Sequence, residues 1–292
     1  MDLFRSFLFI PGNQPRMLQK ASLCEPDVFV PDMEDSVALA DKSEARETVR
    51  AHIELLSATG RPVIPRLNSL DTGLLEEDLS AVSVTGVYGI SVGKVGDVED
   101  IAKIIALMES AEITAGLEIG SIKLLPWIET ASGVINSFSI LSASERVCGA
   151  AFGAEDFTND MGIERREDSR EIMHAKNHLA ISAKAAMVPA LDTPFFAFRD
   201  TDGLNEDSMY SRSIGYKGKF AIHPDQIQTI NACFSPNEKE IEHARKVIEV
   251  FDEAAAKGRG STSLEGLVVD VPVVKRAKAL LNLAEDMKLL GK

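Results

Sequence analysis

Acidic side chains and one arginine follow short apolar runs of this chain, at the points where strands are expected to end. Glu129 and Arg66 each end such a run, and Asp156 lies just beyond another. Carboxylates that converge in a cleft repel one another unless a cation lies between them. Because no Cys or paired His accompanies them, their oxygens suit a hard cation such as Mg²⁺. An arginine beside them could hold a carboxylate or a developing oxyanion.

The elements that would position these residues alternate in type along nearly the whole chain, short β-branched or aromatic runs being followed by helical stretches. We expect eight strands, over residues 6–10, 28–30, 63–66, 87–92, 124–128, 147–152, 187–190 and 220–222. Helical stretches include residues 43–57, 98–108, 172–186 and 224–232. Eight β/α units in 292 residues predict an α/β fold, a (β/α)8 TIM barrel, rather than an open sheet.

The active site of such a barrel lies at the carboxyl ends of its strands. A charged or titratable residue follows seven of the eight expected strands, which favours one acidic, arginine-containing mouth. Each loop acid taken alone is more typical of a surface salt bridge or a helix cap than of a functional site. That alternative is weaker for Glu129 and Asp156, because each follows an apolar strand and faces the expected mouth.

The chain continues beyond the eighth unit. We expect a TIM-barrel catalytic domain over residues 1–235 and a C-terminal helical extension over residues 236–292. Within the extension we expect a helix over 237–256, a flexible Gly/Ser hinge near 257–266, a strand over 267–269 and a helix from 272 to about 290.

Composition excludes several classes of protein. Lys and Arg number 31 against 45 Asp and Glu, so a broad nucleic-acid-binding face is not expected. No apolar run approaches the ~18 residues of a membrane span, and the amino-terminal residues indicate a strand rather than a signal peptide. The three cysteines lie far apart without metal or redox spacing, which is typical of free thiols in a reducing compartment. We therefore expect a cytoplasmic protein without membrane or nucleic-acid partners.

Many short motifs in order give the chain a specific resemblance to one family. They cover residues 5–12, 32–37, 65–68, 128–133, 152–156, 215–219, 222–227 and 269–272. With these motifs the chain resembles the citrate lyase beta subunit-like proteins of the HpcH/HpaI aldolase and malyl-CoA lyase family. The resemblance implies a Mg²⁺-dependent enzyme, with Mn²⁺ as a possible substitute, and implies that Glu129 and Asp156 are the two metal ligands.

The resemblance also assigns roles around the metal. It implies that Arg66 contacts the oxo or hydroxy acid and that Glu34 and Asp35 hold metal-bound waters. It further implies that backbone amides in residues 153–156, those of Ala154 and Glu155 included, hold the carboxylate of the acid.

Farther from the metal, the resemblance makes Arg16 and Lys20 candidates for binding coenzyme A phosphates. Asp270 resembles a catalytic acid/base on the C-terminal extension. In relatives that have this extension, the extension covers the active site of a neighbouring subunit as a lid. The resemblance therefore implies a homotrimer, or a multiple of three, in which Asp270 acts in trans.

The implied reaction cleaves or forms a carbon–carbon bond. A 3-hydroxyacyl-CoA such as citramalyl-CoA, malyl-CoA or citryl-CoA would give acetyl-CoA and a small 2-oxo acid. One alternative is an acyl-CoA thioesterase or a malate or citramalate synthase on the same site. The other is a non-catalytic or carrier-protein-linked subunit of a citrate lyase complex.

Overall fold

Eight parallel strands form a closed barrel in the computed structural model, which describes residues 4–166 and 168–287. The chain divides into two units, Met1–Asn231 and Ala232–Lys292, and the barrel belongs to the first. Neighbouring strands follow the order of the sequence: β1 (Ser6–Pro11), β2 (Val28–Asp32), β3 (Arg66–Leu67), β4 (Gly89–Val92), β5 (Lys123–Ile128), β6 (Ala150–Phe152), β7 (Ala190–Asp192) and β8 (Gly218–Ala221). The expected (β/α)8 TIM barrel is confirmed.

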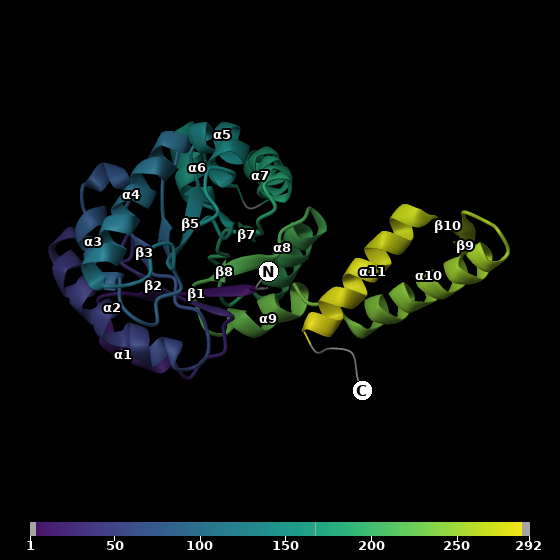
Figure 1. Cartoon of the computed structure of the whole chain (residues 1–292), viewed down its shortest axis with the longest axis horizontal. Coiled ribbons are helices and arrows are strands. Elements are labelled where there is room, and N and C mark those ends of the chain that lie inside the picture. Colours follow the sequence, from purple (N-terminus) through teal and green to yellow (C-terminus); the bar gives the residue numbers. More distant parts are fainter. Residues whose placement is uncertain (1–3, 167, 288–292) are drawn as a thin grey trace. The chain divides into compact units, whose positions relative to one another are not determined.

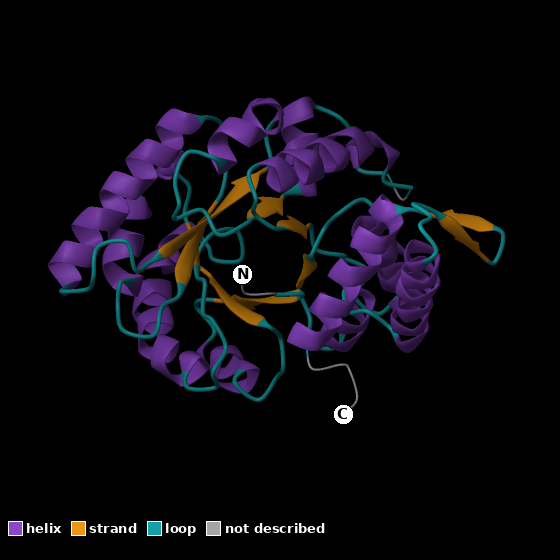
Figure 2. Ribbon diagram, turned by 45° about the vertical axis from the view of Figure 1, so that its right-hand side comes forward, coloured by secondary structure: helices purple, strands orange, loops and turns teal. Residues whose placement is uncertain are grey.

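Helices alternate with the strands and surround the barrel (Figures 1 and 2). They are α1 (Pro15–Ala21), α2 (Lys42–Ser57), α3 (Leu75–Val82), α4 (Val98–Ala115), α5 (Ala131–Leu141), α6 (Ala154–Met161), α7 (Met173–Ala185), α8 (Thr201–Ser213) and α9 (Gln226–Cys233). Short 3-10 turns occur at Leu39–Asp41, Leu70–Thr72 and Arg170–Ile172. Each longer helix buries one face; α2, for example, buries Ala45, Val49, Ile53 and Leu56 at helical spacing.

The interior of the barrel is filled by side chains. Phe7, Trp127 and Phe220 are buried there, and the ring centroids of Trp127 and Phe220 lie 4.4 Å apart. Trp127 Nε1 donates a hydrogen bond of 2.5 Å to Ser91 Oγ, so its one polar atom is satisfied. Because this core leaves no pore, a ligand site has to lie at a mouth of the barrel.

Three strands begin three residues later than the sequence predicts, among them β6, which was expected from residue 147 and begins at Ala150. The segment expected at 63–66 forms a strand only from Arg66, and Val63 contributes an isolated bridge to Phe29. The strand expected at 187–190 lies at Ala190–Asp192, because Met187 has a left-handed φ of 62° that breaks an extended run. Helix α4 extends seven residues beyond the expected end at 108, to Ala115.

The second unit contains α10 (Glu238–Ala256), β9 (Thr262–Leu264), β10 (Leu267–Val269) and α11 (Val271–Asp286). The two helices pack through a buried cluster that includes Val247, Val269 and Val274. The hinge expected near 257–266 contains strand β9, which pairs with β10 across Glu265 and Gly266; their φ values of 51° and 82° suit a two-residue hairpin turn. Strand 267–269 lies where it was expected, whereas the last residues of the helix expected to reach 290 lie outside the described part of the chain.

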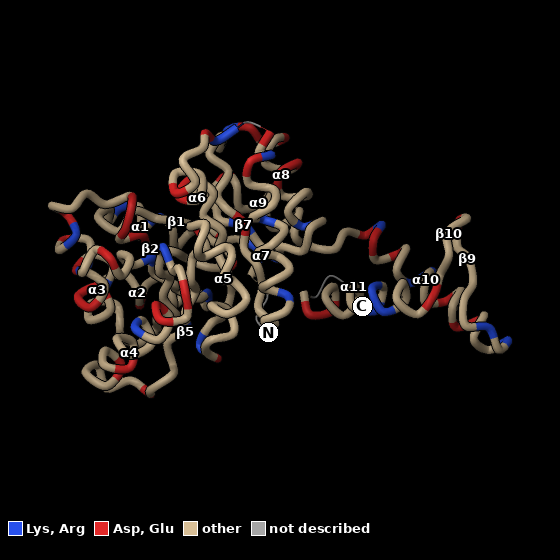
Figure 3. Tube along the Cα trace, turned by 90° about the horizontal axis from the view of Figure 1, so that it is seen from above, with Lys and Arg blue, Asp and Glu red and all other residues tan. Residues whose placement is uncertain are grey.

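Acidic and basic residues are interspersed along the helices of both units (Figure 3). Among the described residues, no helix is long and apolar enough to cross a bilayer. Cys24, Cys148 and Cys233 are free thiols, as expected.

Candidate active site

A cavity of about 410 Å³ lies at the carboxyl ends of the barrel strands. Its acidic and basic lining side chains are Asp32, Asp35, Glu129, Glu155, Asp156 and Arg66. Its other lining residues include Phe9, Pro11, Trp127, Gly153, Thr193, Pro194, Phe196 and Ile222. The structure thus brings together the acidic residues and the arginine that the sequence placed at separate strand ends.

Arg66 is held rigidly at the start of β3. Its Nε lies 2.8 Å from Asp32 Oδ1 and its Nη2 2.7 Å from Asp32 Oδ2, a two-bond fork. Its Nη1 lies 3.0 Å from Asp35 and 3.2 Å from Glu34. The guanidinium also lies over the Phe9 ring, 4.7 Å from its centroid. These contacts fix both the plane and the face of the guanidinium.

Asp32 was not among the expected site residues, although it lies in the motif over residues 32–37. Burial raises its pKa, but the charge and hydrogen bonds of Arg66 outweigh burial and hold the pKa below its usual value. Its carboxylate also accepts hydrogen bonds from the backbone of Glu34 at 2.9 Å and of Ser36 at 3.2 Å. Asp32 therefore organises both Arg66 and the loop that follows β2.

The loop after β2 is also held by a lysine. Lys42 Nζ donates to the carbonyl oxygens of Met33, at 2.7 Å, and Glu34, at 2.6 Å. These bonds satisfy carbonyls that a loop would otherwise leave without partners. The side chain of Glu34 is buried, whereas that of Asp35 is 60% exposed. The two residues expected to hold metal-bound waters thus both contact Arg66 but differ in solvent access.

Glu129 follows β5 and is only 3% exposed. Its Oε1 accepts a hydrogen bond of 2.7 Å from the backbone nitrogen of Lys94. Two glycines make room for its carboxylate: a Cβ at Gly153 would lie 2.2 Å from Oε2, and one at Gly93 would lie 2.7 Å from Oε1. Glycine is therefore required at both positions for Glu129 to keep this conformation.

The carboxylates of the cavity disfavour one another's ionisation. Burial raises the pKa of Glu129 to about 8, and the nearby charges of Asp156 and Glu34 add to the rise. Burial likewise raises the pKa of Glu34 to about 7, against the opposing charge of Arg66. The pKa of Asp156 is raised by burial first and by Asp35 second. A cation among these oxygens would remove this repulsion.

The donor set fits a hard divalent cation. Its atoms are carboxylate oxygens, which Mg²⁺ prefers, and Mg²⁺ usually takes only one or two protein carboxylates and completes its shell with water or substrate. In the part of the chain that the structure describes, no three His, Cys, Asp or Glu side chains are grouped as a ready-made metal site. Glu129 and Asp156 therefore suit a cation that is completed by water and substrate oxygens.

Helix α6 begins at the edge of the cavity, with Gly153 as its N-cap and Glu155 and Asp156 in its first turn. The positive end of the helix dipole and its first-turn amides favour an anion here. The backbone nitrogen of Ala154 already donates to Thr193 Oγ1 at 3.3 Å. The Glu155 side chain pairs with Arg165, with Nε 2.9 Å from Oε1.

Four expected site residues are not among the residues that line this cavity: Glu34, which lines the cavity beside it, and Arg16, Lys20 and Asp270. Arg16 and Lys20 are exposed on α1 and lie four residues apart, hence on one side of that helix. Asp270 is the N-cap of α11 in the second unit, and its Oδ1 accepts a hydrogen bond of 3.2 Å from the backbone of Val273. The roles predicted for Arg16, Lys20 and Asp270 remain predictions.

A closed barrel with an acidic, arginine-containing pocket at the carboxyl ends of its strands is the arrangement of a barrel enzyme. The chain belongs to the HpcH/HpaI aldolase/citrate lyase family, whose family model matches residues 5–224. The resemblance inferred from the sequence motifs is thereby confirmed.

Three similar proteins span nearly the whole chain. Citrate lyase subunit beta of Leuconostoc mesenteroides subsp. cremoris is 36% identical over 99% of this chain and 95% of its own. Mitochondrial citramalyl-CoA lyase of Rattus norvegicus is 29% identical over 97% of this chain and 87% of its own. The CitE protein of Mycobacterium tuberculosis was solved in complex with magnesium, acetoacetate and coenzyme A. It is 26% identical to this chain with a TM-score of 0.81, and the match covers 97% of this chain and 98% of that chain. These relatives indicate that the chain is a lyase.

Proposed function

We propose that this chain is a Mg²⁺-dependent lyase that cleaves a carboxylate-bearing 3-hydroxyacyl-CoA, such as citramalyl-CoA, malyl-CoA or citryl-CoA, to acetyl-CoA and a 2-oxo acid. The observation that carries this proposal is the buried carboxylate of Glu129, beside the carboxylates of Asp156 and Glu34, in a pocket that also contains Arg66. The magnesium, acetoacetate and coenzyme A of the Mycobacterium tuberculosis relative support the same substrate class.

Glu129 and Asp156 would hold the cation, with Mn²⁺ as a possible substitute for Mg²⁺. When bound, the cation supplies a Lewis acid that polarises the substrate's oxygens. Glu34 and Asp35 would orient the surrounding waters, because both carboxylates contact Arg66, which lines the pocket. The amides of the first turn of α6, that of Glu155 in particular, would hold the acid's carboxylate.

Arg66 would donate a hydrogen bond to the oxygen that becomes the carbonyl of the 2-oxo acid. The fork to Asp32 pre-sets its orientation, so little reorganisation accompanies the development of charge. In cleavage the substrate hydroxyl loses its proton to solvent, and the electron pair of the broken carbon–carbon bond becomes that of the acetyl-CoA enolate. Asp270 would then protonate the enolate carbon, or remove a proton there in the condensation direction.

The remaining predicted contacts concern coenzyme A and assembly. Arg16 and Lys20 would bind its phosphates, which their exposure on one side of α1 allows. Asp270 would act on the site of a neighbouring copy within a homotrimer or a multiple of three. This idea is supported by an apolar groove of about 510 Å³ in the second unit and by the exposed side chains of Leu267 and Val268 close to Asp270.

Product analysis tests the proposal. The purified protein would be incubated with Mg²⁺ and each of the three thioesters, with and without EDTA, and the products identified by mass spectrometry. We expect acetyl-CoA and a 2-oxo acid, lost on chelation. If the products are free CoA and an intact hydroxy acid, the protein is a thioesterase and not a lyase. If no thioester is turned over, a carrier-protein-linked subunit is favoured.

A further inference from the structure

We propose that the 2-oxo acid handled at this site bears an uncharged, apolar substituent, as pyruvate does, and not the second carboxylate of oxaloacetate. This inference rests on the proposed lyase function and concerns the wall of the same pocket. The inference distinguishes the candidate acids by charge rather than by size, since a pocket of about 410 Å³ admits both pyruvate and oxaloacetate.

The first argument is the supply of cations. Arg66 is the one basic side chain among the described residues that line the pocket, against five acidic ones. Its guanidinium is already engaged by Asp32, Asp35 and Glu34. Lys94 lines a neighbouring cavity, where Glu34 and Asp35 lie beside it. A second substrate carboxylate in this pocket would therefore lose its hydration without a second basic side chain in the described lining to pair with, which is unfavourable.

The second argument is the apolar wall of the pocket. Phe9, Trp127, Pro194, Phe196 and Ile222 line it. The one donor of the Trp127 ring already bonds to Ser91, so the indole offers a carboxylate no hydrogen bond. A methyl group against this wall would instead remove apolar surface from water, which is favourable.

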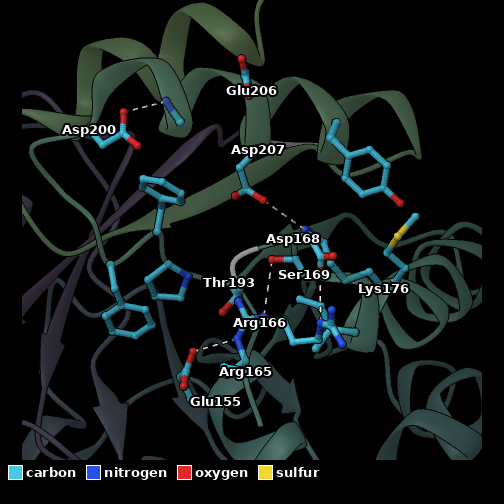
Figure 4. A pocket seen from close by; sticks show the side chains of 17 residues that line it. Glu155, Arg165, Arg166, Asp168, Ser169, Lys176, Thr193, Asp200, Glu206 and Asp207 are labelled. Atoms are coloured by element: carbon cyan, nitrogen blue, oxygen red, sulfur yellow. Dashed lines mark hydrogen bonds and ion pairs between the residues drawn. The ribbon is translucent and has the colours of Figure 1, made fainter.

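The third argument is a side cavity of about 670 Å³ that shares Glu155, Thr193, Pro194 and Phe196 with the pocket (Figure 4). Among the described residues of its lining, Arg165, Arg166 and Lys176 are basic, and each is paired with an acid. Arg165 pairs with Glu155 at 2.9 Å, Arg166 with Asp168 at 3.3 Å, and the buried Lys176 with Asp192 at 2.9 Å. This cavity thus provides room for a substituent longer than a methyl group, but no unpaired basic side chain for a carboxylate in the part of its lining that the structure describes.

Binding and condensation measurements test this inference. Titration calorimetry in the presence of Mg²⁺ would compare pyruvate, 2-oxobutanoate and oxaloacetate, and kcat/KM for condensation with acetyl-CoA would be measured for each acid. We expect pyruvate and 2-oxobutanoate to exceed oxaloacetate by about tenfold or more in both measurements. Equal or stronger binding of oxaloacetate would overturn the inference. Absence of any condensation or thioester cleavage would instead overturn the lyase proposal, while the order of binding would still decide the inference.

A charge added to the wall tests its cause. Phe196 is 55% exposed, so Phe196→Arg should fold. We expect Phe196→Arg to raise the affinity for oxaloacetate relative to pyruvate by about tenfold, because it adds the missing cation. The matched control Phe196→Gln makes the wall polar without adding a charge, so it should shift the ratio of oxaloacetate to pyruvate affinity less than Phe196→Arg does. An unchanged ratio in Phe196→Arg would contradict the electrostatic cause.

Discussion

Asp32 and Arg66 form a buried fork in which both oxygens of one side chain accept hydrogen bonds from two nitrogens of the other, at 2.8 and 2.7 Å. The same carboxylate accepts hydrogen bonds from the backbone amides of Glu34 and Ser36. The fork therefore couples the orientation of the arginine to the conformation of the loop that carries Glu34 and Asp35.

Removing one member of this pair should be costly. Asp32→Asn would leave the charge of Arg66 without its main partner, and breaking a buried pair costs about 3–5 kcal/mol of the free energy of unfolding. Urea denaturation would measure the loss. The matched control is Asp35→Asn, which removes the half-exposed partner of the same guanidinium and should cost less than about 1 kcal/mol. Equal stability of the two variants would contradict the role given to Asp32.

Gly153 should be needed for the position of Glu129. In Gly153→Ala the new Cβ would lie 2.2 Å from Glu129 Oε2, so the carboxylate has to move. Displacement of a catalytic group by about 1 Å can lower turnover by about 10²-fold. Gly96→Ala is the matched control, because its nearest neighbour would be 3.5 Å away at Asp100. Steady-state kinetics should show the loss only in Gly153→Ala, and normal turnover of that variant would argue against the position of Glu129.

Asp270 can be separated from its capping role by choice of substitution. Asparagine caps helices about as well as aspartate, whereas alanine costs about 1 kcal/mol. Asp270→Asn should therefore unfold like the unmodified protein, and Asp270→Ala should be less stable. Both variants should lose the exchange of acetyl-CoA protons with deuterated water. Full exchange in Asp270→Asn would remove the acid/base role and leave the cap alone.

The buried pair of Glu112 and Arg146 should make stability depend on pH. Burial raises the pKa of Glu112, but the amides of Gly120 and Ile122, together with Arg146, outweigh burial and hold it below its usual value. Because the folded pKa is lower than the unfolded one, this stabilisation is complete above the unfolded pKa and is lost as the pH falls through the folded pKa. We expect Glu112→Gln to be less stable than the unmodified protein at pH 7. The difference between their free energies of unfolding should become smaller in acid. Urea denaturation would measure this difference, and a difference that stays constant with pH would contradict the linkage.

The sequence predicted the barrel because apolar strands and helical stretches alternate along it. It predicted that Arg66, Glu129 and Asp156 belong to the site because each lies at or beyond a strand end. The function of Asp32 depends on a contact with a residue 34 positions away, which spacing cannot show. The need for glycine at position 153 likewise depends on the fold around Glu129. Strand β9 was missed because its Gly/Ser-rich surroundings are typical of a linker.

Binding of Mg²⁺ to Asp156 variants tests the central claim most directly. Asp156→Asn removes a proposed ligand, whereas Asp160→Asn changes an aspartate of the same helix whose carboxylate accepts the Ala131 amide at 2.7 Å. Calorimetric titration with Mg²⁺ and turnover against Mg²⁺ concentration would be measured for both. We expect Asp156→Asn to lose at least about 10²-fold in Mg²⁺ affinity and to lose metal-dependent turnover, and Asp160→Asn to keep both. Mg²⁺ binding and turnover by Asp156→Asn equal to those of the unmodified protein would contradict the account.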